Sequence, residues 1–294
     1  MSSTKGDSPS EAKTYRQILL REIVQGEGEL ERSTIGLLLS GLSAGLDVGF
    51  SVFLMAAMFT LAGDEFPPAV LQILLANLYS VGFIFVVIGR SELFTEHTTL
   101  AVFPVLARRA KLSALIRLWV LVYLSNLVGA TIFAFVVTQI GIGLGVTSAQ
   151  AYQHLAQTMV RHSALMILLS GVLAGWLMGL LSWLVKAARE TISQLFTIWL
   201  VASAIGLGHL HHCIVGSVEV LSGLFAGQQI GAADYWHFLI WTTLGNAIGG
   251  VLLVSILKFS HSVNPGKEAL EEEVSAALEK QGSPVESKAK HKPP

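Results

Sequence analysis

The chain contains an internal repeat. The segment LLSGLSAGL at residues 38–46 returns 130 positions later as LLSGVLAGW at 168–176. A second echo, NLVGA at 126–130 and NAIGG at 246–250, lies 120 positions apart and closes each half. Each half holds three hydrophobic spans, so the second copy must enter a bilayer the other way up. Inverted repeats of this kind build transport proteins, with the pathway at the interface between the halves.

Composition indicates a membrane protein. Hydrophobic residues make up 52% of the chain and charged residues only 13%, whereas charged residues are about 25% of a soluble domain. A helix that crosses a hydrocarbon core of roughly 30 Å needs about 20 apolar residues. The spans long enough are 34–62, 69–105, 112–142, 164–185, 192–225 and 235–258. We therefore predict an all-α membrane protein with six transmembrane helices in two inverted three-helix repeats, the second and fifth helices being broken.

Charged residues between the spans predict the orientation. Basic residues follow the second, fourth and sixth spans, namely Arg108, Arg109, Lys111, Lys186, Arg189, Lys258 and Lys267. The other connections are almost free of Lys and Arg, so the positive-inside bias places both termini in the cytoplasm. The core at 34–258 is then preceded by a cytoplasmic segment at 1–33, which could form a short surface helix. It is followed by a cytoplasmic, largely disordered tail at 259–294.

Spans two and five carry polar residues halfway along. The interruptions are GRSELFTEHTT at 89–99 and GLGHLHHCIVGS at 206–217. Backbone freed from helical hydrogen bonding cannot face lipid, so such segments must be buried in protein or line a cavity. Because the two breaks occupy equivalent places in the repeats, they are the best indication of a central site.

The breaks and their surroundings resemble the formate/nitrite transporter family. The resemblance rests on GRSELFTEHT, a His at the second break and the glycine-rich first and fourth spans. HCIVGSVEVLSGLF and IRLW at 116–119 are most similar to its YfdC-like branch. The family resemblance implies a homopentamer with one aquaporin-shaped pore per protomer in a bacterial inner membrane. It also implies transport of small monovalent anions such as formate and nitrite. The paired Asn-Pro-Ala signature of aquaporins is absent from the sequence.

The resemblance also assigns positions in the pathway. It places the central histidine at His212, the inner constriction at Leu93, Phe94, Thr95 and Phe83, and the outer constriction at Tyr79 and Ile205. This chain departs from the formate-type pattern at His211, Gly216 and Gly175, where the family carries an acid and two asparagines. Arg161 lies near the position of the vestibule lysine and could replace it.

Several ionisable residues allow more than one interpretation. His212 could exchange a proton with the substrate or only bond the freed backbone of the break. His209, His211 and His212 could hold zinc only if all three rings met at one point, so we expect no metal site. Arg90 and Glu219 are expected to form a structural ion pair, with anion attraction by Arg90 as the alternative.

The predicted function is a channel or transporter for small monovalent anions or their neutral acids, with proton involvement through His212. A pore for small neutral solutes and a non-conducting membrane assembly or sensor are the alternatives. Cys213 lacks an activating pattern and no phosphate-binding loop occurs, so we expect neither an enzyme nor a cofactor. The expected partners are the anion, protons, the lipid bilayer and further copies of the chain. With a net charge of −1 and no basic stripe, nucleic acid is not expected.

Overall fold

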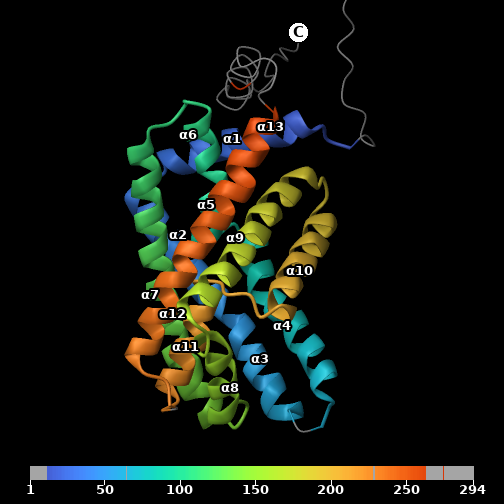
Figure 1. Ribbon diagram of the computed structural model, residues 1–294, viewed down its shortest axis with the longest axis vertical. Coiled ribbons are helices and arrows are strands. Elements are labelled where there is room, and N and C mark those ends of the chain that lie inside the picture. Colours follow the sequence, from blue (N-terminus) through green and yellow to red (C-terminus); the bar gives the residue numbers. More distant parts are fainter. Residues whose placement is uncertain (1–11, 64, 228, 263–273, 275–294) are drawn as a thin grey trace, which may run out of the picture.

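The computed structural model describes residues 12–63, 65–227, 229–262 and 274, and the regular secondary structure of this part of the chain consists of helices (Figure 1). Its helices are α1 (Tyr15–Glu31), α2 (Thr34–Asp47), α3 (Gly49–Ala62), α4 (Pro68–Gly89), α5 (Phe94–Leu100), α6 (Val102–Leu106), α7 (Leu112–Gly143), α8 (Ala149–Val160), α9 (Ala164–Ala187), α10 (Thr191–Leu207), α11 (Val215–Phe225), α12 (Ala232–Ile248), the π-helix η1 (Gly249–Ile256) and α13 (Leu257–Ser262). In Figure 1, α1, α6 and α13 lie at one end of the bundle, the α1 end, and α8 lies at the opposite end, the α8 end. Most of the predicted disordered tail falls outside the described residues.

Five helical segments in the described part of the chain are long and apolar enough to cross a membrane. They are Thr34–Ala62, Pro68–Gly89, Leu112–Gly143, Ala164–Ala187 and Ala232–His261. The predicted fifth span is present as two shorter apolar helices, α10 and α11, which the second break separates. The prediction of an all-helical membrane protein is confirmed.

Both breaks begin with the same backbone turn. Arg90 ends α4 in the left-handed conformation, with φ 58°, and His209 follows α10 with φ 47°. The next amide in each case donates to a carbonyl five residues earlier: Ser91 to Val86 and Leu210 to Ile205, both at 3.0 Å. These bonds satisfy carbonyl groups that a helix end leaves free, and the chain then runs on in another direction.

Small residues bring two pairs of helices into close contact. On α2, a side chain at Gly45 would meet the backbone of Asn126 on α7; on α9, a side chain at Gly175 would meet the backbone of Asn246 on α12. The repeated sequence segments therefore make equivalent contacts in the two halves, as expected of small residues between membrane helices. The Asn246 backbone occupies the space that a side chain at Gly175 would need, so this position requires glycine.

Helix α8 was not predicted from the sequence. Ser148 caps this helix by accepting a hydrogen bond from the Ala151 amide at 3.1 Å. One face is buried against α11 and α3 through Ala151, Tyr152 and Leu155. Its polar residues weaken the hydrophobic signal, and it is too short to span a membrane.

The N-terminal segment forms more than the short surface helix that we expected. Helix α1 has 17 residues and starts with a capping box between Thr14 and Gln17. Its Leu19 and Ile23 are fully buried in a cluster with Phe103 and Trp183 at the α1 end. This helix is therefore docked on the membrane bundle by apolar packing.

The docked face of α1 contains the fully buried carboxyl group of Glu22. The side chain is fully buried, and its two carboxyl oxygens accept hydrogen bonds from the Ser182 hydroxyl of α9 at 3.0 and 3.3 Å. Burial raises the pKa of Glu22 to about 7, although Lys186 and the Ser182 hydrogen bond oppose the rise. The protein therefore favours the protonated form of Glu22.

We expect the docking of α1 to weaken as pH rises. Because the folded-state pKa of Glu22 exceeds its ordinary value, the stabilisation is complete below about pH 4.5 and is lost as pH rises through about 7. The difference corresponds to about 3 kcal/mol. Thermal unfolding across this range should show Glu22→Gln to be more stable than wild type at about pH 8 and similar at about pH 4.5. Glu31→Gln, at an exposed position of the same helix, is the control. Parallel pH profiles for wild type and Glu22→Gln would contradict this account.

Candidate functional site

Two asparagines hold the two breaks in equivalent ways. Asn126 of α7 accepts a hydrogen bond from the Phe94 amide at 2.8 Å and donates to the carbonyls of Gly41 and Glu92 at 2.7 and 2.8 Å. Each of these groups belongs to α2 or to the first break. Since both the Asn126 side chain and the backbone it bonds are buried, these bonds satisfy groups that water cannot reach.

Asn246 of α12 repeats this arrangement at the second break. Its amide oxygen accepts from the Cys213 amide at 2.9 Å, and its amide nitrogen donates to the carbonyls of Gly171 and His211, both at 2.9 Å. The side chain is fully buried. The two asparagines thus fix the non-helical backbone of both breaks, which is the condition for such backbone at membrane depth.

The breaks bring Thr95 and His212 together. The Thr95 Oγ1 and His212 Nε2 atoms are 2.8 Å apart, and both residues are fully buried. On the other side of the ring, Nδ1 accepts hydrogen bonds from the amides of Ile214 and Val215 at 3.3 and 3.2 Å. Because these amides can only donate, the hydrogen-bond network assigns the ring proton to Nε2. His212 therefore presents an N–H donor toward Thr95.

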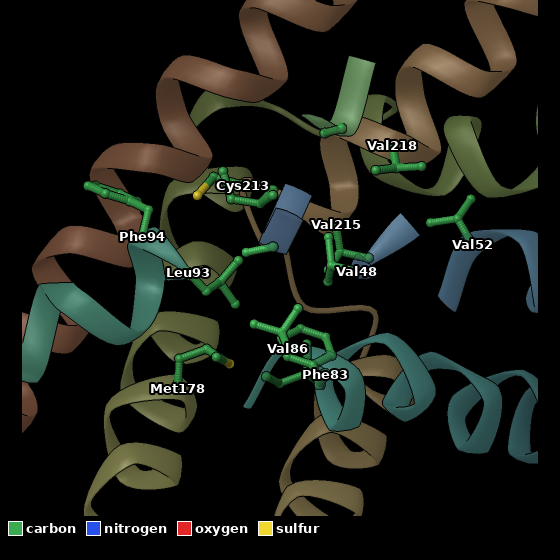
Figure 2. Packing of buried hydrophobic residues seen from close by; sticks show 14 of the residues in the cluster. Val48, Val52, Phe83, Val86, Leu93, Phe94, Met178, Cys213, Val215 and Val218 are labelled. Carbon is green, nitrogen blue, oxygen red and sulfur yellow. The ribbon is translucent and has the colours of Figure 1, made fainter. Parts of the chain in front are cut away.

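Apolar side chains surround this polar pair. The Phe83 ring meets the His212 ring edge-on, with centroids 5.2 Å apart and an interplanar angle of 89°. Figure 2 shows Phe83 and Val86 of α4 close to Leu93 of the first break, with Val48 and Val215 facing them in the same buried cluster. Phe83 and Leu93 are fully buried. His212 and Thr95 thus offer hydrogen bonds in a setting that excludes water.

A cavity of about 700 Å³ opens at the α1 end. Its charged and polar lining residues are Arg21, Gln25, Glu29, Arg90, Ser91, Glu92, Glu96, Lys186, Arg189 and Gln194. The cavity thus reaches the first break at Ser91 and Glu92. Four basic residues and three acidic residues thus line it, so an anion that enters meets both cations and carboxylates, with the cations in excess by one.

A second, smaller pocket of about 30 Å³ lies at the α8 end. It is lined by Met55, Gln72, Leu75, Tyr79, His154, Leu155, Thr158, Met159, Ile205, Gly206, His209, Leu210 and Glu219. The Tyr79 ring lies 5.4 Å from that of Phe83, centroid to centroid. Tyr79 and Ile205 therefore line the pocket, while Phe83 connects Tyr79 to His212. Buried side chains separate this pocket from the cavity at the α1 end.

Some predicted site residues lie elsewhere. The Phe94 ring packs on α7, with centroids 4.8 Å from Tyr123 and 6.1 Å from Trp119, although its amide is held at the break. Arg161 is exposed at the end of α8 and donates to Gln157. Neither side chain lines either of the two cavities described above.

The ion pair expected between Arg90 and Glu219 is not present in the described part of the chain. Arg90 lines the cavity at the α1 end, and Glu219 lines the pocket at the α8 end. The prediction was wrong because a helical span separates the end of α4 from the middle of α11. Sequence alone places both residues near the breaks but does not give their depth.

The three histidines of the second break point to different partners. His211 Nδ1 lies 2.8 Å from the Ser170 hydroxyl and its Nε2 lies 3.0 Å from the Met159 carbonyl. His212 contacts Thr95, and His209 lines the pocket at the α8 end. His211 thus braces the second break against α8 and α9.

A network of ion pairs and hydrogen bonds around Glu92 of the first break was also not predicted. Glu92 forms ion pairs with Arg32 and His97, and its amide donates to the Ser40 hydroxyl at 3.1 Å. Arg32 follows α1 and also pairs with Glu29. The network ties the first break to the end of α1. The signal available in the sequence was an acidic residue, Glu92, within the break and a histidine, His97, on the short helix α5 that follows it.

Known proteins similar to this chain were found by sequence and by structure. Residues 16–260 match the family described as formate/nitrite transporter. The chain is 31% identical over 259 residues to the inner membrane protein YfdC of Escherichia coli (strain K12), covering 87% of this chain and 80% of that protein. A solved FNT family ion channel has a TM-score of 0.73 at 21% identity, covering 84% of this chain and 98% of that one. A pentameric formate channel with formate bound has a TM-score of 0.67 at 24% identity, covering 78% and 98%.

Proposed function

The chain belongs to the formate/nitrite transporter family, and on this premise we propose that it is a membrane channel or transporter for small monovalent anions or their neutral acids. The observation that carries the proposal is the buried pair of Thr95 and His212, which lies between the cavity at the α1 end and the pocket at the α8 end. Such a pair can bind an anion, and because the ring proton of His212 is on Nε2, the ring is not placed to take a proton from the Thr95 hydroxyl. Formate- and nitrite-type anions are the substrate class that the family suggests.

The proposed architecture is a homopentamer of six-span protomers, each with two inverted three-helix repeats, in a bacterial inner membrane. The equivalent bonds of Asn126 and Asn246 support the repeat, because each holds its own break against its own pair of glycine-rich helices. The pentamer is suggested by the pentameric channel of similar fold. The basic residues after the even-numbered spans support cytoplasmic termini, with the α1 end inside and the α8 end outside.

The proposed mechanism replaces the water around an anion by hydrogen bonds from the protein. The Nε2–H group of His212 and the hydroxyl of Thr95 are donors that an anion of a few atoms could meet. Phe83, which packs on the His212 ring, and Leu93 and Ile205 are fully buried, so hydrated ions are excluded. Proton transfer through His212 stays a prediction. It would require Nδ1 to release the amides of Ile214 and Val215 when it takes up a proton.

Substitutions at the buried pair test this mechanism. We expect His212→Ala and Thr95→Val each to lower anion uptake by proteoliposomes at least about tenfold, since a lost donor costs about 1.4 kcal/mol or more at the barrier. If His212 also carries the proton, the pH dependence of the remaining uptake in His212→Asn should flatten. His237→Asn, at a half-buried position on α12 away from the pair, is the control. Wild-type uptake rates in both pair variants would refute the proposed site.

A pore for small neutral solutes is the second candidate. The observation that favours it is the acidic Glu219 side chain in the pocket at the α8 end, where an anion-selective entrance would be expected to be basic. Uptake of glycerol without uptake of formate or nitrite would support this candidate. Absence of all solute flux from folded protein would instead favour a non-conducting assembly.

A further inference from the structure

The carboxyl group of Glu219 is buried without a partner. The residue lies on α11 and is 5% exposed. It has neither a hydrogen bond nor an ion pair with any residue that the structure describes, and it faces the small pocket at the α8 end. An isolated carboxylate at such a position is costly, whereas a neutral carboxylic acid is much less so. The pocket therefore contains a polar group whose binding capacity is unused by the protein.

The ionisable groups around Glu219 do not include a strong cation. The pocket itself adds Tyr79 of α4, His154 of α8 and His209 of the second break. Two of the helices packed against α11 bring no ionisable group into the pocket, because α3 has none and the Arg117 and Tyr123 side chains of α7 hydrogen-bond elsewhere. Helix α12, which also packs on α11, carries Asp234, Tyr235 and His237, and none of them lines the pocket. The remaining ionisable residue of α8, Tyr152, donates to the Val137 carbonyl.

The protonation state of Glu219 decides what the pocket can bind. As a carboxylate it repels an anion in a setting where little water screens the charge. As a carboxylic acid it has an O–H donor that an anion can accept. The pocket, at about 30 Å³, has room only for a species of a few atoms. Tyr79 and Ile205 also line this pocket. Tyr79 contacts Phe83, which packs on His212, so the pocket adjoins the buried pair.

We propose that Glu219 is a specificity-determining residue of the α8-end entrance, which admits a small monovalent anion when its carboxyl is protonated and excludes it when ionised. The proton comes from the water on the α8 side and stays on Glu219 while the anion accepts a hydrogen bond from it. No covalent bond of the anion changes. This inference rests on the proposed anion transport, and it makes entry acid-dependent independently of His212.

Uptake of radiolabelled formate by proteoliposomes tests the proposal, with the pH varied on the α8 side. Wild-type uptake should fall as pH rises. Glutamine cannot ionise and keeps an N–H donor, so in Glu219→Gln uptake should fall much less with pH and be about tenfold above wild type at the alkaline end. Glu219→Asp, which can still ionise, should restore the pH dependence. Glu65→Gln, at an exposed position in the connection between α3 and α4, should behave like wild type.

The outcomes distinguish a failure of the role proposed for Glu219 from a failure of the proposed anion transport. Wild-type uptake with an unchanged pH profile in Glu219→Gln overturns the role of Glu219 and leaves anion transport intact. Absence of formate and nitrite uptake by folded wild-type protein overturns both. If Glu219→Gln does not fold, infrared difference spectra of wild type and Glu219→Asp on addition of nitrite decide the question. A protonated carboxyl band that appears with nitrite and shifts in Glu219→Asp supports the proposal, and its absence overturns it.

Discussion

Alanine at Gly249 should prevent the protein from reaching a stable folded state. A Cβ atom at this position would lie 2.6 Å from the backbone nitrogen of Trp176 and still closer to the carbonyl oxygen of Val172. Both atoms belong to the backbone of α9, so no side-chain rotation can relieve the overlap. Moving η1 away from α9 would also disturb the neighbouring Asn246 bonds. We expect a loss of about 3 kcal/mol or more.

Size-exclusion chromatography and thermal unfolding in mild detergent measure this effect. Gly143→Ala is the matched control, because a Cβ at Gly143 on α7 meets nothing within 4 Å. The control should elute and unfold like wild type, whereas Gly249→Ala should aggregate or unfold at a much lower temperature. Equal unfolding temperatures for Gly249→Ala and the control would show that α9 and η1 are not packed as described.

Removal of the Asn246 side chain should abolish transport and weaken the fold. Asn246→Ala leaves the Cys213 amide and the carbonyls of Gly171 and His211 without the partners they have now. Buried backbone groups left unpaired cost about 1–3 kcal/mol each, so we expect a loss of roughly 3 kcal/mol or more. Since Cys213 follows His212 directly, the His212 ring should also leave its position opposite Thr95.

Two measurements separate these effects. Thermal unfolding gives the stability loss, and anion uptake per folded protein gives the functional loss, expected to be at least about tenfold. Asn77→Ala is the control for asparagine truncation, because Asn77 bonds its own helix at Ile73 and the exposed Trp199 side chain. Asn126→Ala should match Asn246→Ala if the two breaks are held equivalently. Normal uptake in either variant would contradict the role given to these bonds.

Much of the fold could be predicted because its strongest signals are local. Apolar spans, glycine-rich segments and polar interruptions are each visible in a single stretch of sequence. The similarity of the sequences that begin at Asn126 and Asn246 was also visible, but the structural role of the two side chains was not. Their role depends on three hydrogen bonds each, to backbone that only the folded chain brings near.

The parts that could not be predicted depend on depth and direction. Arg90 and His209 adopt the left-handed conformation that glycine or asparagine usually takes, so neither helix end carries its common signal. The sequence could not show that the Phe94 ring turns toward α7 while Leu93 lies close to Phe83 and Val86 of α4 (Figure 2). The same limit explains the expected pair of Arg90 and Glu219, whose side chains line cavities at opposite ends.

Uptake of radiolabelled formate, nitrite and glycerol by proteoliposomes containing the wild-type protein tests the central claim most directly. The protein is held to pass small anions or their neutral acids through the buried site of Thr95 and His212. This account predicts that formate or nitrite enters well above the level of protein-free vesicles, while glycerol stays at that level. Entry of glycerol with neither formate nor nitrite, in protein shown to be folded, would contradict it.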